Sequence, residues 1–367
     1  MPSKKSNTPI AQLYQNLSDP FKGTKGYQTE EISDKRIVSL NSNENLVYPL
    51  DILQKNLHEI IETIDLRIYP ESHGQSLCEK IAERNSLLPS QIVIANGSDA
   101  IIDVIVRMSI EAGDSVSIIN PTFSMYEHAT KVRGGITKNL YLTKAPEFDL
   151  DLDSILTENS PKENKLLFLC NPNNPTGKQY AKEKIETILQ EYPGIIALDE
   201  AYAGFGRYSF ATRVDEFPNL IVLKTFSKLY GLAGIRIGYS LSSQFLANRL
   251  KIILPYYNVN AIAIELAKKI FEEQQIITRV RDYIVTERER VYNELLKIEG
   301  ITPFKSDTNF IMFETKIIPQ EKLLQELKNR GLLLRDLSKF PLCKDCLRVT
   351  ITTEENNNLF LNYLRDI

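Results

Sequence analysis

Short apolar segments alternate with helix-like segments through the middle of the chain. Strands that are buried on both faces of a parallel sheet read as continuous apolar runs, and a crossover helix joins each strand to the next. The alternation therefore predicts an α/β domain with a mostly parallel sheet. The candidate strands are residues 91–95, 115–120, 165–171, 195–199, 220–224 and 235–240.

Helical spacing is clearest after Ser98 and Asp99, which form a good N-cap pair ahead of Ile101, Ile105 and Met108. Beyond the predicted sheet, helical and strand-like segments are mixed, which indicates a smaller α+β domain. Further helices are expected at residues 180–191, 261–298 and 321–330, and further strands at residues 309–314 and 347–353.

We expect the chain to have three parts. Residues 1–35 are polar and rich in turn formers, which predicts an N-terminal arm with one short helix near residues 10–17. Residues 36–255 form the large domain. Residues 256–367, together with part of the N-terminal segment, form the small C-terminal domain.

Composition argues against several classes of function. The formal net charge is −3 and both signs are interleaved, so we expect binding neither to nucleic acid nor to a membrane. The N-terminus lacks the apolar stretch of a secretion signal. Apolar runs such as residues 166–170 are too short to span a bilayer. We therefore expect a cytoplasmic protein that acts on small molecules.

The cysteines and histidines predict no metal centre. Cys343 and Cys346 form a Cys-x-x-Cys motif, but the sequence offers no second ligand pair at the spacing that zinc needs. An extended segment follows the motif, whereas a thioredoxin-type site would open a helix. The three histidines all precede residue 130, which disfavours histidine-based catalysis. We expect a structural or incidental role for the cysteine pair.

Four of the candidate strands end in glycine or polar residues, and ligands of open α/β sheets bind beyond the carboxyl ends of the strands. The first strand leads through Gly97 into the helix at Ser98. Its free backbone N–H groups form either an anion site or an ordinary helix start. The second strand ends in Asn-Pro-Asn-Asn-Pro-Thr-Gly at residues 171–177, which is either a functional loop or a plain turn.

The other two strand ends carry ionisable groups. Asp199 lies at the mouth of a buried strand, where a carboxylate is costly unless a cation such as a pyridinium nitrogen pairs with it. A structural capping role is the alternative. Lys228 follows Ser227 and precedes Arg236, a combination that suits a phosphate-bearing aldehyde cofactor. The other interpretation is a solvated lysine in a polar loop.

Taken together, these motifs resemble those of the pyridoxal 5′-phosphate (PLP)-dependent aminotransferases of fold type I. Within that superfamily the chain is most similar to the histidinol-phosphate aminotransferase family, through Leu-Asn-Ser-Asn-Glu-Asn at residues 40–45 and Arg-Ile-Tyr-Pro at residues 67–70. The resemblance covers about residues 36–355. It implies a mostly parallel seven-stranded sheet in the large domain. The superfamily motifs are residues 171–177, Asp-Glu-Ala-Tyr at 199–202, Ser-Lys at 227–228 and Gly-x-Arg at 234–236.

The resemblance implies roles in a cofactor site. Lys228 would hold PLP as a Schiff base and, once freed, move a proton between substrate and cofactor. Asp199 would pair with the pyridinium nitrogen and keep it protonated. Phe123, where the family commonly has tyrosine, would stack on the ring. Contacts to the ring oxygen or the phosphate are implied for Tyr202, Asn174, Ser98, Asp99, Thr225, Ser227 and Arg236.

It also implies substrate contacts and an assembly. Arg348 would bind the amino-acid carboxylate, and Arg335 a substrate phosphate or the side chain of glutamate. Tyr69 would reach the cofactor phosphate of the neighbouring subunit in a homodimer. Positions near the substrate are implied for Asn43, Tyr256 and Asn309, and for one of the arm aromatics Phe21 and Tyr27.

The expected reaction moves an amino group between glutamate and imidazole-acetol phosphate, giving 2-oxoglutarate and histidinol phosphate in histidine biosynthesis. Alternatives of the same fold are an aminotransferase for another phosphorylated keto substrate, an aromatic or broad-specificity aminotransferase, and a phosphoserine- or phosphothreonine-type decarboxylase. A PLP-binding transcription regulator would need a DNA-binding domain, and residues 1–35 show no basic helix-turn-helix pattern.

Overall fold

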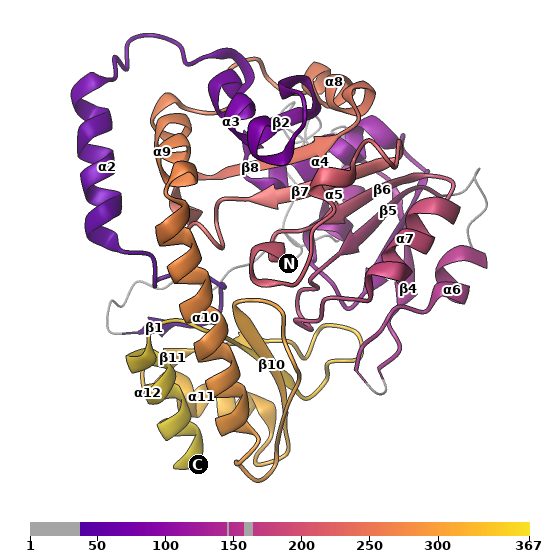
Figure 1. Cartoon of the computed structure of the whole chain (residues 1–367). Coiled ribbons are helices and arrows are strands. Elements are labelled where there is room, and N and C mark those ends of the chain that lie inside the picture. The colour runs from indigo at the N-terminus through magenta and orange to yellow at the C-terminus, as the bar shows by residue number, and fades with distance from the viewer. Residues whose placement is uncertain (1–36, 145–146, 158–163) are drawn as a thin grey trace, which may run out of the picture.

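A seven-stranded sheet, called here the large sheet, forms the upper part of the molecule in Figure 1. The structure is a computed structural model that describes residues 37–144, 147–157 and 164–367, so the predicted arm and its aromatics lie outside the described residues. The strand order is β2-β8-β7-β6-β5-β3-β4, and β8 runs against the other strands. The strands are β2 (Ile92–Asn96), β3 (Ser115–Asn120), β4 (Ile136–Tyr141), β5 (Asn164–Cys170), β6 (Ile195–Asp199), β7 (Leu220–Thr225) and β8 (Ile237–Ser242).

Helices cover both faces of the large sheet, because alternate residues of each strand point to opposite faces. Val93 and Ala197 pack with α4, α5 and α8 on one face. Ile94 and Leu198 pack with α3, α7, α9 and α10 on the other. The expected α/β architecture with a mostly parallel sheet is confirmed. The helices are α2 (Leu50–Thr63), α3 (Gln75–Asn85), α4 (Ser98–Ser109), α5 (Met125–Val132), α6 (Leu152–Thr157), α7 (Lys182–Glu191), α8 (Gln244–Ile253), α9 (Ala261–Glu272), α10 (Gln274–Leu295), α11 (Gln320–Asn329) and α12 (Glu354–Arg365).

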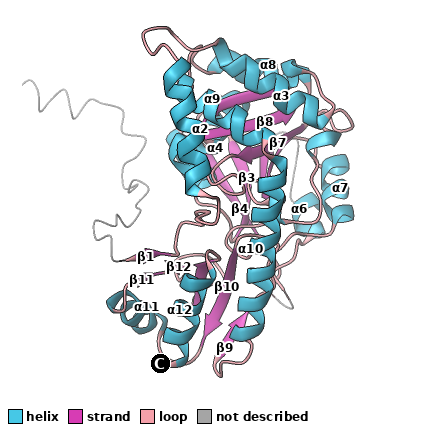
Figure 2. Ribbon diagram, turned by 60° about the vertical axis from the view of Figure 1, so that its left-hand side comes forward, coloured by secondary structure: helices cyan, strands magenta, loops and turns pink. Residues whose placement is uncertain are grey.

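A four-stranded antiparallel sheet, called here the small sheet, lies at the other end of the molecule (Figures 1 and 2). Its order is β12-β13-β10-β9, and α10 contacts β9 and β10 of this sheet as well as η3 beside the large sheet. The first described strand, β1, pairs in parallel with β11 next to the small sheet. The remaining elements are β1 (Val38–Ser39), β9 (Ile301–Pro303), β10 (Phe310–Thr315), β11 (Leu332–Leu333), β12 (Arg335–Asp336), β13 (Cys346–Thr350) and the short 3₁₀ helices η1 (Ser72–Gly74), η2 (Pro89–Gln91), η3 (Ala203–Phe205), η4 (Ala211–Arg213) and η5 (Ala233–Ile235).

The helix expected over residues 261–298 is two helices, α9 and α10, and this prediction was wrong. The chain leaves helical geometry at Glu273, where ψ is 54°. The carboxylate of Glu273 accepts hydrogen bonds from the Tyr48 hydroxyl (2.5 Å) and the Asn56 side-chain amide (2.8 Å). These tertiary bonds stabilise the break, which no glycine or proline marks in the sequence.

Two smaller expectations also need correction, and one strand was missed. Ser98 and Asp99 are not N-caps, because Gly97 occupies the cap position with φ 86° and the helix begins at Ser98. The strand expected at residues 235–240 begins only at Ile237, since η5 precedes it. The edge strand β4 was not foreseen from the residues themselves.

Among the described residues, no helix has the length and apolar character needed to cross a bilayer.

Candidate active site

A cavity of about 400 Å³ lies beyond the carboxyl ends of β2, β5, β6 and β7. The small sheet contributes Arg335 of β12 and Arg348 of β13 to its wall. The structure therefore brings together most of the site residues that the sequence predicted. Those that line the cavity are Asn43, Ser98, Asp99, Phe123, Asn174, Asp199, Tyr202, Thr225, Ser227, Lys228, Arg236, Arg335 and Arg348.

Lys228 lies in the turn after β7 and is partly buried in the cavity wall. Its Nζ donates to the carbonyl oxygen of Ser42 (2.8 Å) and lies 5.9 Å from the ring centre of Tyr202. Burial, together with the charge of Arg348, lowers the pKa of Lys228 from 10.5 to about 8. A lysine with this pKa is partly neutral near neutral pH, and only the neutral amine is a nucleophile.

Asp199 ends β6 and is almost fully buried. Its Oδ1 accepts the backbone N–H of Ala201 (2.9 Å), and its Oδ2 accepts the hydroxyl of Tyr126 (2.6 Å). Burial raises the pKa of Asp199 above its ordinary value, and no Lys, Arg or His in the described part of the chain forms an ion pair with it. A bound heterocyclic cation would balance the negative charge of this buried carboxylate.

Tyr202 follows β6, and its hydroxyl accepts a hydrogen bond from Asn43 Nδ2 (2.8 Å). Asn43 has φ 54°, a conformation that is uncommon for residues other than glycine. It is stabilised because its N–H donates to Thr350 Oγ1 and its carbonyl accepts from Asn309 Nδ2, both at 3.0 Å. Burial raises the pKa of Tyr202, so its hydroxyl keeps a proton that it can donate into the cavity.

A close approach of backbones forms one end of the cavity. A Cβ on Gly238 would lie 2.2 Å from the backbone nitrogen of Ser98, so only glycine lets β8 pack against the start of α4. A Cβ on Gly97 would lie 2.6 Å from Nη2 of Arg236, a residue that itself has φ 55°. Such strained positions gather at ligand sites. Nη2 of Arg236 also pairs with Asp99 at 3.1 Å.

Hydroxyl groups complete this end of the cavity. Thr225 Oγ1 and Ser227 Oγ lie 3.0 Å apart, and the N–H of Ser227 donates to Thr225 Oγ1 (3.1 Å). The first-turn amides of α4 have no acceptor within their own helix. Hydroxyls, amides at a helix N-terminus and the guanidinium of Arg236 form a donor set suited to a phosphate group.

Arg335 and Arg348 lie directly opposite each other in the antiparallel pair β12–β13. Arg348 is buried, donates to the Asn41 carbonyl (2.6 Å) and to Asn174 Oδ1, and lies 5.0 Å over the ring centre of Phe310. The guanidinium of Arg335 has no hydrogen-bond partner or ion pair among the residues that the structure describes. Two adjacent arginines, one fixed and one available, can bind two anionic groups of a ligand.

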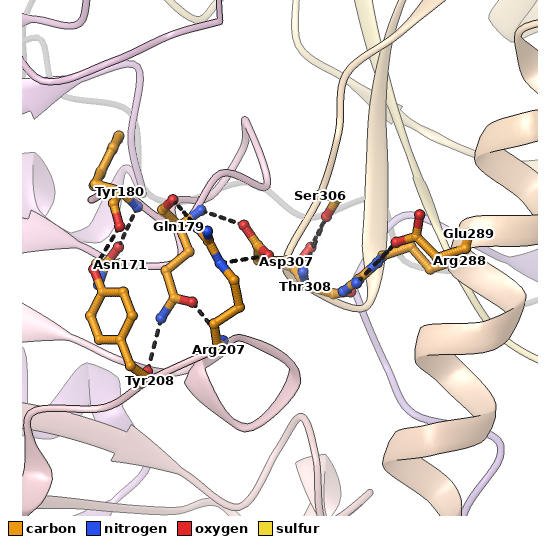
Figure 3. A network of polar contacts seen from close by, with 10 residues as sticks. All are labelled: Asn171, Gln179, Tyr180, Arg207, Tyr208, Arg288, Glu289, Ser306, Asp307 and Thr308. Carbon is orange, nitrogen blue, oxygen red and sulfur yellow. Dashed lines mark hydrogen bonds and ion pairs between the residues drawn. The ribbon is translucent and has the colours of Figure 1, made fainter. Parts of the chain in front are cut away.

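The loop that carries Asn174 is fastened to the segment before β10 (Figure 3). The N–H of Asp307 donates to the Gly177 carbonyl (2.7 Å), and its carboxylate accepts the N–H of Gln179 (3.0 Å). The same carboxylate forms an ion pair with Arg207 at 3.4 Å. Asp307 thereby connects the Asn174 loop to the segment that leads into β10 of the small sheet.

Three predicted residues do not line the cavity. Tyr69 is 77% exposed and stacks on Tyr257 with ring centres 4.7 Å apart. Tyr256 is 59% exposed. Asn309 is fully buried behind the cavity wall and reaches it through its bond to Asn43.

Two functional contacts were not predicted. No role was predicted for Tyr126, yet its hydroxyl donates a hydrogen bond to Asp199. Ser42, between two asparagines of the family signature, provides the carbonyl that Lys228 contacts. Proximity to predicted site residues was the only sequence signal for either contact.

The described residues contain no group of three or more His, Cys, Asp or Glu side chains arranged to bind a metal ion. Cys343 and Cys346 are buried free thiols. Cys346 begins β13, so an extended segment follows the motif as expected.

The chain matches the family described as aminotransferase class I and II over residues 35–364. The histidinol-phosphate aminotransferase of Thermoanaerobacter pseudethanolicus is 34% identical over 356 residues, which cover 97% of this chain and 99% of that protein. The histidinol-phosphate aminotransferase of Parabacteroides distasonis is 35% identical, over 82% of this chain and 86% of that protein.

Solved structures share the fold. The histidinol-phosphate aminotransferase from Clostridium acetobutylicum superposes with a TM-score of 0.82 and 26% identity, covering 90% of this chain and 98% of that chain. The L-threonine-O-3-phosphate decarboxylase from Porphyromonas gingivalis superposes with a TM-score of 0.78 and 25% identity, covering 90% and 99%. The fold therefore hosts both of the reaction types that the sequence left open.

Proposed function

This chain belongs to the aminotransferase class I and II family and is a PLP-dependent enzyme of fold type I, and from that premise we propose a specific reaction. It transfers an amino group between glutamate and imidazole-acetol phosphate, giving 2-oxoglutarate and histidinol phosphate. The names of three relatives that are 32–34% identical to this chain support this substrate pair. The step belongs to histidine biosynthesis.

The observation that carries the proposal is the pair of facing arginines, Arg335 and Arg348, in one cavity wall. The cavity must bind a dicarboxylate in one half-reaction and a phosphate ester in the other. Arg348 holds the carboxylate beside the amino group. Arg335, free of partners among the described residues, binds either the phosphate or the second carboxylate of glutamate. An aromatic amino acid would leave this guanidinium without a counter-charge.

The remaining residues fit the cofactor. When bound, PLP supplies the electron sink that stabilises negative charge at the substrate carbon. Lys228 would hold the cofactor through its amine and, when free, would move a proton at the substrate carbon. Asp199 pairs with the ring nitrogen, and Tyr202 and Asn174 orient the ring oxygen. Phe123 covers one ring face. The phosphate would accept hydrogen bonds from backbone N–H groups at Ser98 and Asp99, from the hydroxyls of Thr225 and Ser227, and from the guanidinium of Arg236.

The proposal includes an assembly. An exposed apolar surface gathers around Tyr69 and includes Leu66, Ile68, Tyr256 and Tyr257. Surfaces of this kind commonly mark protein interfaces. We assign it to the interface of a homodimer, in which Tyr69 reaches the cofactor phosphate of the neighbouring subunit. The domain boundary at residue 255 and the cytoplasmic location remain predictions.

Substrate assays test the proposal. With glutamate as donor, imidazole-acetol phosphate should be the best acceptor in a panel that also contains other keto phosphates and aromatic keto acids. Release of CO₂ from phosphoserine or phosphothreonine without amino transfer would instead identify a decarboxylase. Borohydride reduction followed by peptide mapping should place the pyridoxyl group on Lys228, and its appearance on another lysine would contradict the cofactor site.

The variant Arg335→Gln tests the anion assignment. Loss of a charged hydrogen-bond donor to the phosphate should raise KM for imidazole-acetol phosphate by about 10-fold or more. The exposed Arg281, which lies on α10 and pairs with Asp282, offers a matched control in Arg281→Gln. An unchanged KM in Arg335→Gln would show that another residue binds the phosphate.

A further inference from the structure

Tyr126 forms a short hydrogen bond to the predicted cofactor carboxylate from a different element. It lies in the first turn of α5 and is fully buried. Its hydroxyl is 2.6 Å from Oδ2 of Asp199, although 73 residues separate the two in sequence. A distance of about 2.5–2.7 Å is typical of a hydroxyl that donates to an ionised carboxylate.

The packing around Tyr126 holds its hydroxyl in place. The ring stacks on Phe168 of β5, with ring centres 4.6 Å apart and an interplanar angle of 4°. Its edge meets Phe123, which lines the cavity, at 5.7 Å. The Tyr126 carbonyl accepts the hydroxyl of Thr130 (2.7 Å). The side chain is therefore fixed between the sheet and α5, with its hydroxyl directed at Asp199.

Asp199 needs such donors. Burial raises its pKa most, and the neighbouring carboxylates of Asp99 and Glu200 raise it further. The hydrogen bonds from Tyr126 and from the N–H of Ala201 lower the pKa of Asp199. Burial and the adjacent carboxylate also raise the pKa of Tyr126 well above its ordinary value, so it remains a donor over the working pH range. The thiol of Cys170 is the other titratable group beside Tyr126.

We infer that Tyr126 is a positioning residue that keeps Asp199 ionised and directed at the ring nitrogen, and thereby controls the protonation of the cofactor. The inference rests on the proposed function, because it requires PLP in this cavity. Without the Tyr126 hydroxyl, the proton shared between Asp199 and the ring nitrogen would shift toward Asp199. A less protonated ring stabilises negative charge at the substrate carbon less well.

The variant Tyr126→Phe isolates the hydroxyl, because phenylalanine keeps the ring stacked on Phe168. We expect kcat to fall by about 10-fold or more, the factor expected when one hydrogen bond to a charged group is lost. The visible band of the bound cofactor should titrate at higher pH, since a less protonated ring withdraws less charge from the Lys228 nitrogen. Tyr192→Phe is the matched control. This variant removes a buried hydroxyl that is hydrogen-bonded to Ser117. Tyr192 precedes the start of β6, whereas Asp199 lies at the other end of that strand.

A double-mutant cycle separates positioning from folding. In the Asp199→Asn background, Tyr126→Phe should cause no further loss of kcat and no further shift of the band. Equal losses in both backgrounds, or a band in Tyr126→Phe that titrates as in the unsubstituted protein, would overturn the inference. An unsubstituted protein that shows no visible band with PLP would instead overturn the proposed function.

Discussion

Burial shifts the pKa values of the two central ionisable residues of the cavity in opposite directions. It disfavours the charged form of each, so it lowers the pKa of Lys228 and raises that of Asp199. At Lys228 the charge of Arg348 adds to the effect, and the amine becomes easier to deprotonate. At Asp199 two hydrogen bonds oppose it, which keeps the carboxylate available to a cation.

The pKa of Lys228 predicts a pH dependence for cofactor attachment. Only the neutral amine attacks an aldehyde, so the rate should rise with pH through about 8 and level off above pH ~9. Arg348→Gln removes a positive charge that lowers this pKa, so its midpoint should move upward. The measurement is the rate at which the visible band appears after apoprotein is mixed with PLP.

The exposed Arg281→Gln serves as control and should keep the midpoint near pH 8. A rate that does not change between pH 6 and pH 10 would show that Lys228 is not the reacting amine. The variant Lys228→Ala should show no visible band and no turnover, while its circular dichroism spectrum matches that of the unsubstituted protein.

Among single residues, those at the ends of predicted strands could be assigned to the site from the sequence. Asp199 ends a predicted strand, and Asn174 and Lys228 each follow one within a few residues. Their convergence could be inferred because ligands of open α/β sheets bind beyond the carboxyl ends of the strands. The bond of Tyr126 to Asp199, and that of Asn43 to Tyr202, join positions 73 and 159 residues apart. No local pattern encodes such contacts, because they depend on how α5 and the first described segment pack.

Among the secondary-structure elements, β8 and α4 pack so closely that a methyl group added at Gly238 should disturb the phosphate end of the cavity. In Gly238→Ala the new Cβ would meet the backbone of Ser98 and push β8 away from the start of α4. Overpacking of about 1–3 kcal/mol at this point should weaken PLP binding by about 5-fold or more. Titration of apoprotein with PLP measures the change.

Gly234→Ala provides the comparison, because nothing lies within 4 Å of its added Cβ and its backbone is not left-handed. Its thermal midpoint should match that of the unsubstituted protein, whereas that of Gly238→Ala should fall. Unchanged PLP affinity in Gly238→Ala would mean that the β8–α4 contact does not shape the phosphate site.

The link through Asp307 predicts a stability effect. Asp307→Ala leaves the N–H of Gln179 without its acceptor and breaks the ion pair with Arg207. We expect the free energy of unfolding to fall by about 1–3 kcal/mol, as measured by urea denaturation. The exposed Asp345, whose backbone carbonyl accepts from Thr315, offers the control variant Asp345→Ala. A loss no larger than that of the control would contradict a fastening role.

Elements buried on both faces were predictable, and elements defined by their neighbours were not. The segment 195–199 is continuously apolar up to its final aspartate, and β6 has these bounds. In contrast, β4 contains three consecutive polar residues, Thr-Lys-Asn, and is exposed or half-buried at most positions because it lies at the edge of the large sheet. The break at Glu273 depends on side chains of α2 and the segment before it, which contact the chain there.

In the whole molecule, both sheets contribute to the candidate active-site cavity, and one predicted cofactor residue, Tyr69, lies outside it. The small sheet places Arg335 and Arg348 against the ends of the large-sheet strands. Tyr69 lies on the exposed aromatic surface and not in the cavity of its own chain. If Tyr69 serves the site of a second copy, then each active site contains residues from two chains.

Subunit complementation tests this arrangement. Lys228→Ala should be inactive, and Tyr69→Ala should be strongly impaired. A mixed dimer of the two variants has one site with both substitutions and one site with the intact Lys228 of one chain and the intact Tyr69 of the other. Since about half of randomly assorted dimers are mixed, co-refolding equal amounts should restore about one quarter of the unsubstituted activity. If Tyr69 acted within its own chain, each site of the mixed dimer would carry a substitution, and mixing would restore no activity.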